Sequence, residues 1–402
     1  MAVQTLTNKS HYQITRQLCW AFFLISTISC TANNSTNTPS PTLKDAFRGQ
    51  FLIGIAVNER QFTEADPKAV QLITNNFNSI SPENVLKWQS VHPSPETYTF
   101  DMADKFVEFG LKHNMVIIGH TLVWHHQTPL WVFQNEKGEK VDRETLIARM
   151  RDHIHTVVGR YKGKIKGWDV VNEALNENGQ LRRSRWLEII GPDYIKLAFK
   201  FAHEADPDVE LYYNDYSIEN EPKRRGAIEI VKSLKAEGIR IDAVGMQGHY
   251  LMNWPTLQQI ENTINDFKKL GVKVMITELD IDVLPRVEGH LGGGDIRTIR
   301  ITDPQRWHEL DPYPDGLPEE KQDALAQRYA ELFKVFLKHH DTISRVTFWG
   351  LTDGESWLNY NPVPGRHNHP LLFDRQYKPK KAYYAIIRAA QEFESSQKNK
   401  DK

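Results

Sequence analysis

The chain has 402 residues, of which 40% are hydrophobic and 25% are charged, a composition typical of a globular protein rather than a disordered one. Its formal net charge is −1, so it lacks the basic surplus that would indicate nucleic acid or an anionic membrane as a main partner. Both cysteines, Cys19 and Cys30, lie near the N-terminus, which excludes a disulfide scaffold or a cysteine-based metal site in the rest of the chain.

The first 30 residues have the pattern of an export signal. A basic leader with Lys9 and Arg16 precedes an apolar segment over 18–28, which is too short to span a bilayer. The segment ends Thr-Ile-Ser-Cys at Cys30 and resembles the lipobox of bacterial lipoproteins, in which the cysteine becomes the lipidated first residue. We expect an exported lipoprotein of the cell surface or outer membrane, held there only by a lipid on Cys30. The alternative is an ordinary cleaved signal and a periplasmic or secreted protein.

Residues 31–42 are rich in Thr, Asn, Ser and Pro, which predicts a flexible linker. No polar linker interrupts residues 43–394, so we expect one folded domain there, followed by a polar tail over 395–402. We expect the protein to be a monomer.

Short apolar runs alternate with segments of helical spacing through this domain. Eight runs are predicted as strands: 51–57, 79–80, 116–119, 165–171, 210–213, 243–246, 272–277 and 346–349. Strands that alternate with helices predict an α/β fold, a (β/α)8 TIM barrel. A doubly wound open sheet is the alternative, but no glycine-rich phosphate-binding loop follows the first strand.

Two of the predicted strands end in a carboxylate, which is costly to bury without a partner or a function. Glu173 follows the fourth strand after Asn172, and Glu278 follows the seventh. Because the loops after barrel strands build the active-site face, we interpret the two glutamates as a pair facing one cleft. The alternative is two unrelated surface glutamates. The segment over 285–318, which follows the seventh strand, is predicted as an enlarged loop or lid over this face.

The other strand ends favour the cleft, because polar or aromatic residues occur at every one of them. These residues are Asn58 and Glu59, then Glu83, Asn84, Lys87 and Trp88, His120, Trp124 and His125, Asn214, Asp215 and Tyr216, Gln247 and His249, Asp280, and Trp349, Asp353 and Trp357. Amides, histidines, a lysine and flat aromatic rings suit a ligand with many hydroxyls and apolar ring faces, such as a sugar chain.

Other ligand classes fit this set less well. A phosphate would require glycine-rich loops or clustered arginines. The adjacent His125 and His126, and the alternating His367 and His369, do not fit a metalloenzyme motif. We therefore expect neither a metal nor another cofactor.

Seven motifs stand out within residues 43–394. They are S-P-E-N-V-L-K-W at 81–88, G-H-T-L-V-W-H at 119–125, W-D-V-V-N-E-A at 168–174, Y-N-D-Y at 213–216, Q-G-H at 247–249, I-T-E-L-D at 276–280 and T-F-W-G-L-T-D-G-E-S-W at 347–357. With these motifs the segment resembles the family 10 glycoside hydrolases, the endo-β-1,4-xylanases. The resemblance implies a single catalytic domain that hydrolyses internal β-1,4-xylosidic bonds of xylan.

The resemblance also assigns roles to individual residues. Glu173 would be the acid/base and Glu278 the nucleophile, while Tyr216 would stack on the aglycone side. The glycone subsites would be lined by Glu83, Asn84, Lys87, His120, Trp124, Gln247, Trp349 and Trp357. The chain departs from the family pattern at Ser217, where Asn is expected, and in the longer loop over 285–318.

A retaining mechanism follows for such a pair if the carboxyl groups lie about 5–5.5 Å apart. His249 is expected to donate a hydrogen bond to Glu278 and to be oriented by Asp280. Asn172 would hold the sugar 2-hydroxyl. Glu173 would stay protonated until sugar esterifies Glu278 and removes the neighbouring negative charge.

Two alternatives remain at this point. A retaining β-1,4-glucanase would share the two glutamates, although Trp349 and Trp357 are expected to crowd a hexose 6-hydroxymethyl group and so favour xylose. A non-catalytic glycan-binding protein of the cell surface would keep the groove without turnover.

Overall fold

The computed structural model describes residues 41–287 and 298–400. The predicted signal peptide, Cys30 and most of the predicted linker lie outside the described residues, as does 288–297 of the predicted loop. Within the described part, no helix is both long enough and apolar enough to cross a membrane.

Eight parallel strands form a closed barrel, which confirms the predicted (β/α)8 fold. The strand order is β6-β5-β4-β3-β2-β1-β9-β8, and β8 pairs with β6 to close the ring. A short additional strand, β7 (His249–Leu251), pairs with the end of β8. The barrel strands are β1 (Leu52–Val57), β2 (Ser79–Pro82), β3 (Val116–Val123), β4 (Gly167–Asn172), β5 (Glu210–Asp215), β6 (Ala243–Met246), β8 (Lys273–Asp282) and β9 (Ile343–Phe348).

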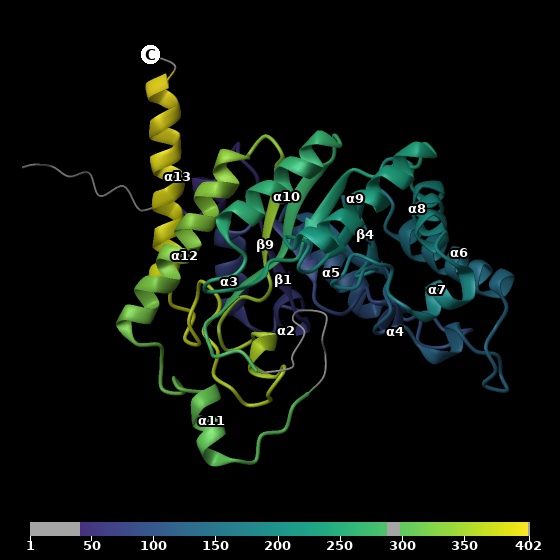
Figure 1. Cartoon of the computed structure of the whole chain (residues 1–402), viewed down its shortest axis with the longest axis horizontal. Helices are drawn as coiled ribbons and strands as arrows, with labels where there is room; N and C mark the ends of the chain where they lie inside the picture. Colours follow the sequence, from purple (N-terminus) through teal and green to yellow (C-terminus); the bar gives the residue numbers. More distant parts are fainter. Residues whose placement is uncertain (1–40, 288–297, 401–402) are drawn as a thin grey trace, which may run out of the picture. The chain divides into compact units, whose positions relative to one another are not determined.

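Helices surround the barrel, and short helices lie in the loops that follow the strands (Figure 1). The longer helices are α3 (Pro67–Asn76), α5 (Asp101–Lys112), α6 (Arg143–Arg160), α8 (Tyr194–Ala205), α9 (Glu221–Ala236), α10 (Leu257–Lys269), α12 (Glu319–Lys338) and α13 (Lys381–Lys400). The short ones are α1 (Leu43–Ala46), α2 (Glu59–Phe62), α4 (Trp88–Val91), η1 (Leu130–Val132), α7 (Arg185–Ile190), α11 (Pro304–Leu310) and η2 (Trp357–Asn359).

Several element ends differ from those predicted, and three differ by four residues or more. Strand β3 continues beyond residue 119 to Val123, and β8 continues beyond residue 277 to Asp282. Their polar residues stay extended because side-chain partners on neighbouring strands satisfy them inside the barrel, a compensation that apolar patterning does not reveal. Helix α13 extends to Lys400, so residues 395–400 of the predicted tail belong to it.

Two strand glycines make room for large rings. A Cβ atom at Gly119 would lie 2.1 Å from the ring of Trp168, and one at Gly167 would lie 2.0 Å from the hydroxyl oxygen of Tyr212. Gly167 therefore lets Tyr212 pack inside the barrel, and Gly119 lets Trp168 pack on the outer face of the strands. The larger apolar core lies between the strands and the helices.

A stack of aromatic rings joins α6 to α4. The ring of His153 is stacked on that of Trp88 with centroids 3.6 Å apart, and His92 is stacked on Tyr98 at 3.8 Å. His153 is fully buried. Burial, with a smaller contribution from His92, holds the pKa of His153 well below its usual value.

We expect this histidine to make the fold sensitive to acid. The unfolded chain binds a proton at His153 below about pH 6.5, while the folded chain does not, so the free energy of unfolding falls as the pH drops below that value. His153 is expected to lower the free energy of unfolding by about 1.4 kcal/mol for each pH unit below that value. Urea unfolding at pH 7 and pH 5 measures it for the native chain and His153→Gln; equal pH dependence in both would contradict this expectation.

Candidate active site

The two glutamates lie at the same end of the barrel, on β4 and β8. Glu173 directly follows β4, and Glu278 lies within β8; their exposed fractions are 4% and 5%. Glu173 has φ = 57°, a left-handed conformation that costs a non-glycine residue roughly 1–2 kcal/mol. Such strain at a buried carboxyl group is typical of a functional site.

Neutral groups hold the carboxyl group of Glu173. Gln247 donates to Oε1 at 2.9 Å, and the indole N–H of Trp124 donates to Oε2 at 3.0 Å. Asn172 also donates to Oε1, at 3.3 Å. These contacts fix the direction of the carboxyl group without placing a formal charge against it.

The carboxylate of Glu278 has a cationic partner instead. His249 Nε2 lies 3.1 Å from Glu278 Oε2, and His249 Nδ1 lies 3.0 Å from Asp280 Oδ1, so both ring nitrogens donate to carboxylates. Burial alone would lower the pKa of His249, but Asp280 and then Glu278 outweigh it and raise it to about 10. Trp357 fixes Asp280 by donating to its Oδ2 at 2.7 Å.

The histidine keeps Glu278 ionised. Burial by itself would raise the pKa of Glu278, but the hydrogen bond from His249 and the nearby His120 and Asn214 lower it below its usual value. The direct hydrogen-bond partners of the two carboxyl groups therefore differ: those of Glu173 are neutral, whereas Glu278 has a cationic one.

Asn214 joins the surroundings of the two carboxyl groups. Its amide donates to Glu278 Oε1 and to Asn172 Oδ1, both at 2.9 Å. The hydroxyl of Thr277 donates to Asn214 Oδ1 at 2.6 Å and fixes the orientation of this amide. The sequence places Asn214 at a strand end but does not single it out, since its role depends on two other strands.

Asp169 is a second residue that the sequence does not indicate. It is buried in the middle of β4, where its Oδ2 lies 2.9 Å from His120 Nδ1. The pair orients the His120 ring, and Trp349 lies edge-on to that ring with centroids 5.5 Å apart. The one signal in the sequence that could have indicated Asp169 is its position as a charged residue within an otherwise apolar strand.

Lys87 is a buried cation close to the glutamate pair. Its ammonium group donates to Asn84 Oδ1 at 3.2 Å and lies 5.0 Å from the centroid of the Trp124 ring. Burial lowers the pKa of Lys87 to about 8, against the opposing effect of Glu278, Glu173 and Glu83. Burial, and then Glu355, raises the pKa of Glu83 to about 7.

Two cavities are lined by predicted site residues. One, of about 170 Å³, is lined by His249, Trp254, Asp280 and Trp357, among others, and so adjoins the partners of Glu278. A second cavity, of about 450 Å³, follows β1 and β2 and is lined by Glu83, Asn84, Glu355 and Tyr360, among others.

The match to a known family covers most of the chain. Residues 42–389 match the family model described as glycosyl hydrolase family 10. The chain belongs to glycosyl hydrolase family 10.

Proteins named as xylanases are similar to this chain over most of their length. The endo-1,4-beta-xylanase A of Xylanibacter ruminicola is 48% identical, over 92% of this chain and 98% of its own. The endo-1,4-beta-xylanase of Geobacillus stearothermophilus is 41% identical, over 86% of this chain and 98% of its own. The solved structure of a family 10 endoxylanase retrieved from a sugarcane soil metagenome superposes with a TM-score of 0.83 at 45% identity. The match covers 86% of this chain and 99% of that one.

Tyr216, expected to stack against a leaving-group sugar, is 5% exposed. Its hydroxyl accepts a hydrogen bond from Arg182 Nη2 at 2.8 Å, and the Lys223 ammonium lies 3.2 Å from its ring centroid. One ring face is thus covered by the protein. The neighbouring Ser217, where the family pattern has Asn, lines the cavity beside His249 and has φ = 53°.

The described part of the 285–318 loop has a small apolar core of its own. Val287 and Leu310 pack with Val363 from the loop after β9, and Trp307 packs against them. The same loop contains α11, which Figure 1 shows at the end of the barrel where α2 lies. Its proposed action as a lid stays a prediction.

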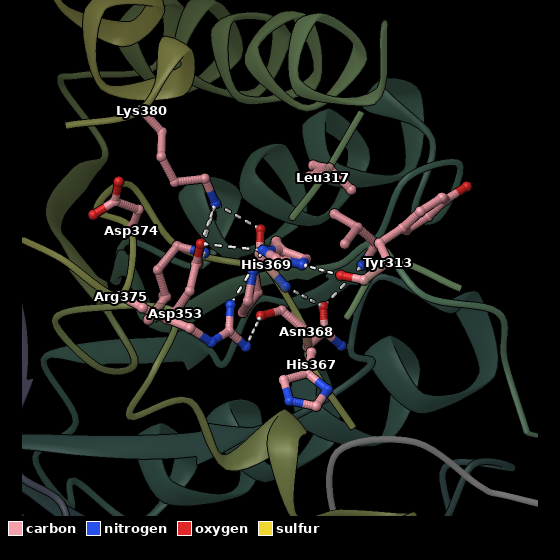
Figure 2. A network of polar contacts seen from close by, with 12 residues as sticks. Tyr313, Leu317, Asp353, His367, Asn368, His369, Asp374, Arg375 and Lys380 are labelled. Carbon is pink, nitrogen blue, oxygen red and sulfur yellow. Dashed lines mark hydrogen bonds and ion pairs between the residues drawn. The ribbon is translucent and has the colours of Figure 1, made fainter. Parts of the chain in front are cut away.

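The alternating histidines lie in a polar network that connects this loop to the one after β9 (Figure 2). His367 Nδ1 lies 2.8 Å from Asp311 Oδ2, and His369 Nε2 donates to the carbonyl of Tyr313 at 3.0 Å. Arg375 Nη1 lies 3.2 Å from His369 Nδ1, which therefore accepts. Among the described residues, no three His, Cys, Asp or Glu side chains are placed to hold a metal.

Proposed function

We propose that this family 10 protein is an endo-1,4-β-xylanase that cleaves internal bonds of xylan with retention of anomeric configuration. One observation carries the proposal: two buried carboxyl groups, Glu173 and Glu278, are joined by hydrogen bonds through two asparagine amides, and only Glu278 is also bonded to a charged histidine. The similar proteins named endo-1,4-beta-xylanases support it.

The reaction proceeds in two displacements. The Glu278 carboxylate attacks the anomeric carbon, the glycosidic bond breaks, and Glu173 gives its proton to the leaving oxygen. Water then attacks the glycosyl ester, gives a proton to Glu173 and releases Glu278. His249 and Asp280 support the first step by keeping the nucleophile ionised and oriented.

The amides around Glu173 suit the sugar 2-hydroxyl, because Asn172 and Gln247 approach the same carboxyl oxygen. A contact to that hydroxyl strengthens as positive charge develops at the anomeric carbon. Trp349 and Trp357 both lie edge-on to His249, with ring centroids at 6.5 Å and 5.0 Å. From these positions we expect the two rings to crowd the extra 6-hydroxymethyl group of glucose.

The proposal is tested by measuring reducing ends released from xylan and from carboxymethyl cellulose, with NMR of the first product. We expect xylan to be cleaved at least about 10-fold faster, since excluding one hydroxymethyl group is worth about 1–3 kcal/mol. The first product should carry the β-configuration. Equal rates would favour a β-1,4-glucanase, an α-product would exclude the double displacement, and binding without turnover would indicate a glycan-binding protein.

The sequence further supports the proposal that the chain is exported as a monomeric lipoprotein, with the lipid on Cys30. Mass spectrometry of the N-terminal peptide from the membrane fraction checks this. An unmodified N-terminus beyond Cys30 would contradict it. Analytical ultracentrifugation of the mature protein measures its oligomeric state, and a mass above that of one chain would contradict the monomer.

A further inference from the structure

A hairpin directly after β4 brings a cation back to Glu173. Leu175 and Leu181 form an antiparallel bridge, and the amide of Arg182 donates to the carbonyl of Ala174 at 2.7 Å. The turn of this hairpin contains Gly179, with φ = 81°, where a Cβ atom would lie 2.1 Å from the carbonyl oxygen of Pro222. The turn is therefore packed tightly against the start of α9.

The guanidinium group of Arg182 bonds to two backbone carbonyls of the segment that begins at Glu173. Its Nε donates to the carbonyl of Glu173 at 3.1 Å, and its Nη2 donates to the carbonyl of Leu175 at 3.1 Å. Glu173 is the residue with the left-handed backbone. Because φ and ψ of Glu173 set the direction of its side chain, the arginine restrains where the carboxyl group points.

The same guanidinium also reaches Tyr216, which follows β5. Its Nη2 donates to the Tyr216 hydroxyl at 2.8 Å. Lys223 also contacts Tyr216: its ammonium group lies against the ring and 3.0 Å from Asp215 Oδ1. Arg182 thus connects the turn that carries Glu173 to the aromatic residue expected on the leaving-group side.

We propose that Arg182 is a positioning residue for proton donation, holding Glu173 in line with the leaving oxygen and fixing it relative to Tyr216. This inference rests on the proposed function. A planar fork makes all three bonds at once, whereas a lysine ammonium on a flexible stem satisfies only part of them. Arg182 does not touch the reacting atoms; it acts through Glu173.

The inference is tested with aryl β-xylobiosides whose leaving groups differ in their need for a proton. Phenol leaves poorly and requires the acid, whereas 2,4-dinitrophenol leaves without it. For Arg182→Met we expect kcat/KM to fall about 100-fold on the phenyl substrate, the effect of misplacing a catalytic group by about 1 Å. On the dinitrophenyl substrate we expect a change of less than about 3-fold. Arg182→Lys should recover part of the loss.

Arg183 provides the matched control. It is the next residue, its side chain is 87% exposed, and its nearest acidic partner, Glu188, lies 3.9 Å away. Arg183→Met should leave both kcat/KM values unchanged. Tyr216→Phe keeps the arginine and removes one acceptor, so it should show a smaller loss with the same dependence on the leaving group, even if Arg182→Met fails to fold.

Equal losses on both substrates in the Arg182 and Tyr216 variants would overturn the inference, because a general structural defect does not depend on the leaving group. So would phenyl-substrate activity in Arg182→Met equal to that of Arg183→Met. The proposed function has its own readout in the native protein: cleavage of neither aryl substrate nor xylan would refute that function, and the positioning role with it.

Discussion

Glu278→Ala is expected to reduce kcat on xylan on the order of 10⁵-fold, the scale seen when a catalytic nucleophile is removed. The alanine offers no group to form the glycosyl ester, and the amides around Glu173 cannot replace it. The fold should survive, because His249 keeps Asp280 as a partner. Losing one buried hydrogen-bonded group costs about 1–3 kcal/mol, less than the usual total stability. Reducing-end assays and thermal unfolding measure the two effects.

Azide distinguishes a missing nucleophile from a damaged site. In Glu278→Ala, azide can occupy the vacated space and attack an activated dinitrophenyl xylobioside directly, which yields an α-configured glycosyl azide. Glu261→Gln is the control, since this carboxylate pairs with Lys338 and His339 on the helices outside the barrel. Near-normal xylan hydrolysis by Glu278→Ala would end the assignment of the nucleophile.

Glu173→Ala is expected to lower kcat/KM on xylan by roughly 10²–10⁴-fold, the usual contribution of a general acid. The loss should be far smaller on a dinitrophenyl xylobioside in the first step, because that leaving group departs without a proton. The second step should then limit turnover, since water loses its base. Pre-steady-state release of dinitrophenol would appear as a burst followed by slow turnover.

Azide should restore turnover in Glu173→Ala as well, but the product should have the anomeric configuration opposite to that formed by Glu278→Ala. It needs no base, and it attacks the ester formed on Glu278 to give a β-configured azide. An α-configured product from Glu173→Ala, or loss of the burst, would show that the roles of the two glutamates are reversed.

The sequence predicts the barrel because each strand and helix has its own local pattern, and it predicts the two glutamates because each ends an apolar run. The role of Asn214 could not be predicted from such local patterns. Its function comes from simultaneous contacts to Asn172, Glu278 and Thr277, which belong to β4 and β8. A contact between strands distant in sequence leaves no periodic signal in any one of them.

Arg182 was hidden for a different reason. It lies in an irregular hairpin close to Arg183 and Arg185, and residue type alone does not distinguish a half-buried guanidinium bonded to two carbonyls from an exposed one. The lengths of β3 and β8 were underestimated because His120 and Asp280 look like loop residues until their partners, Asp169 and His249, are known.

Closure of the barrel through the pairing of β6 with β8 has a consequence for inactivation by heat. Strand β8, which carries Glu278, is bonded on one edge to β6 and on the other to β9, which itself pairs with β1 near the start of the domain. Melting of either neighbour removes half of the strand's backbone pairing. Loss of activity and loss of circular dichroism should therefore follow one thermal curve, with no inactive but fully folded species between them.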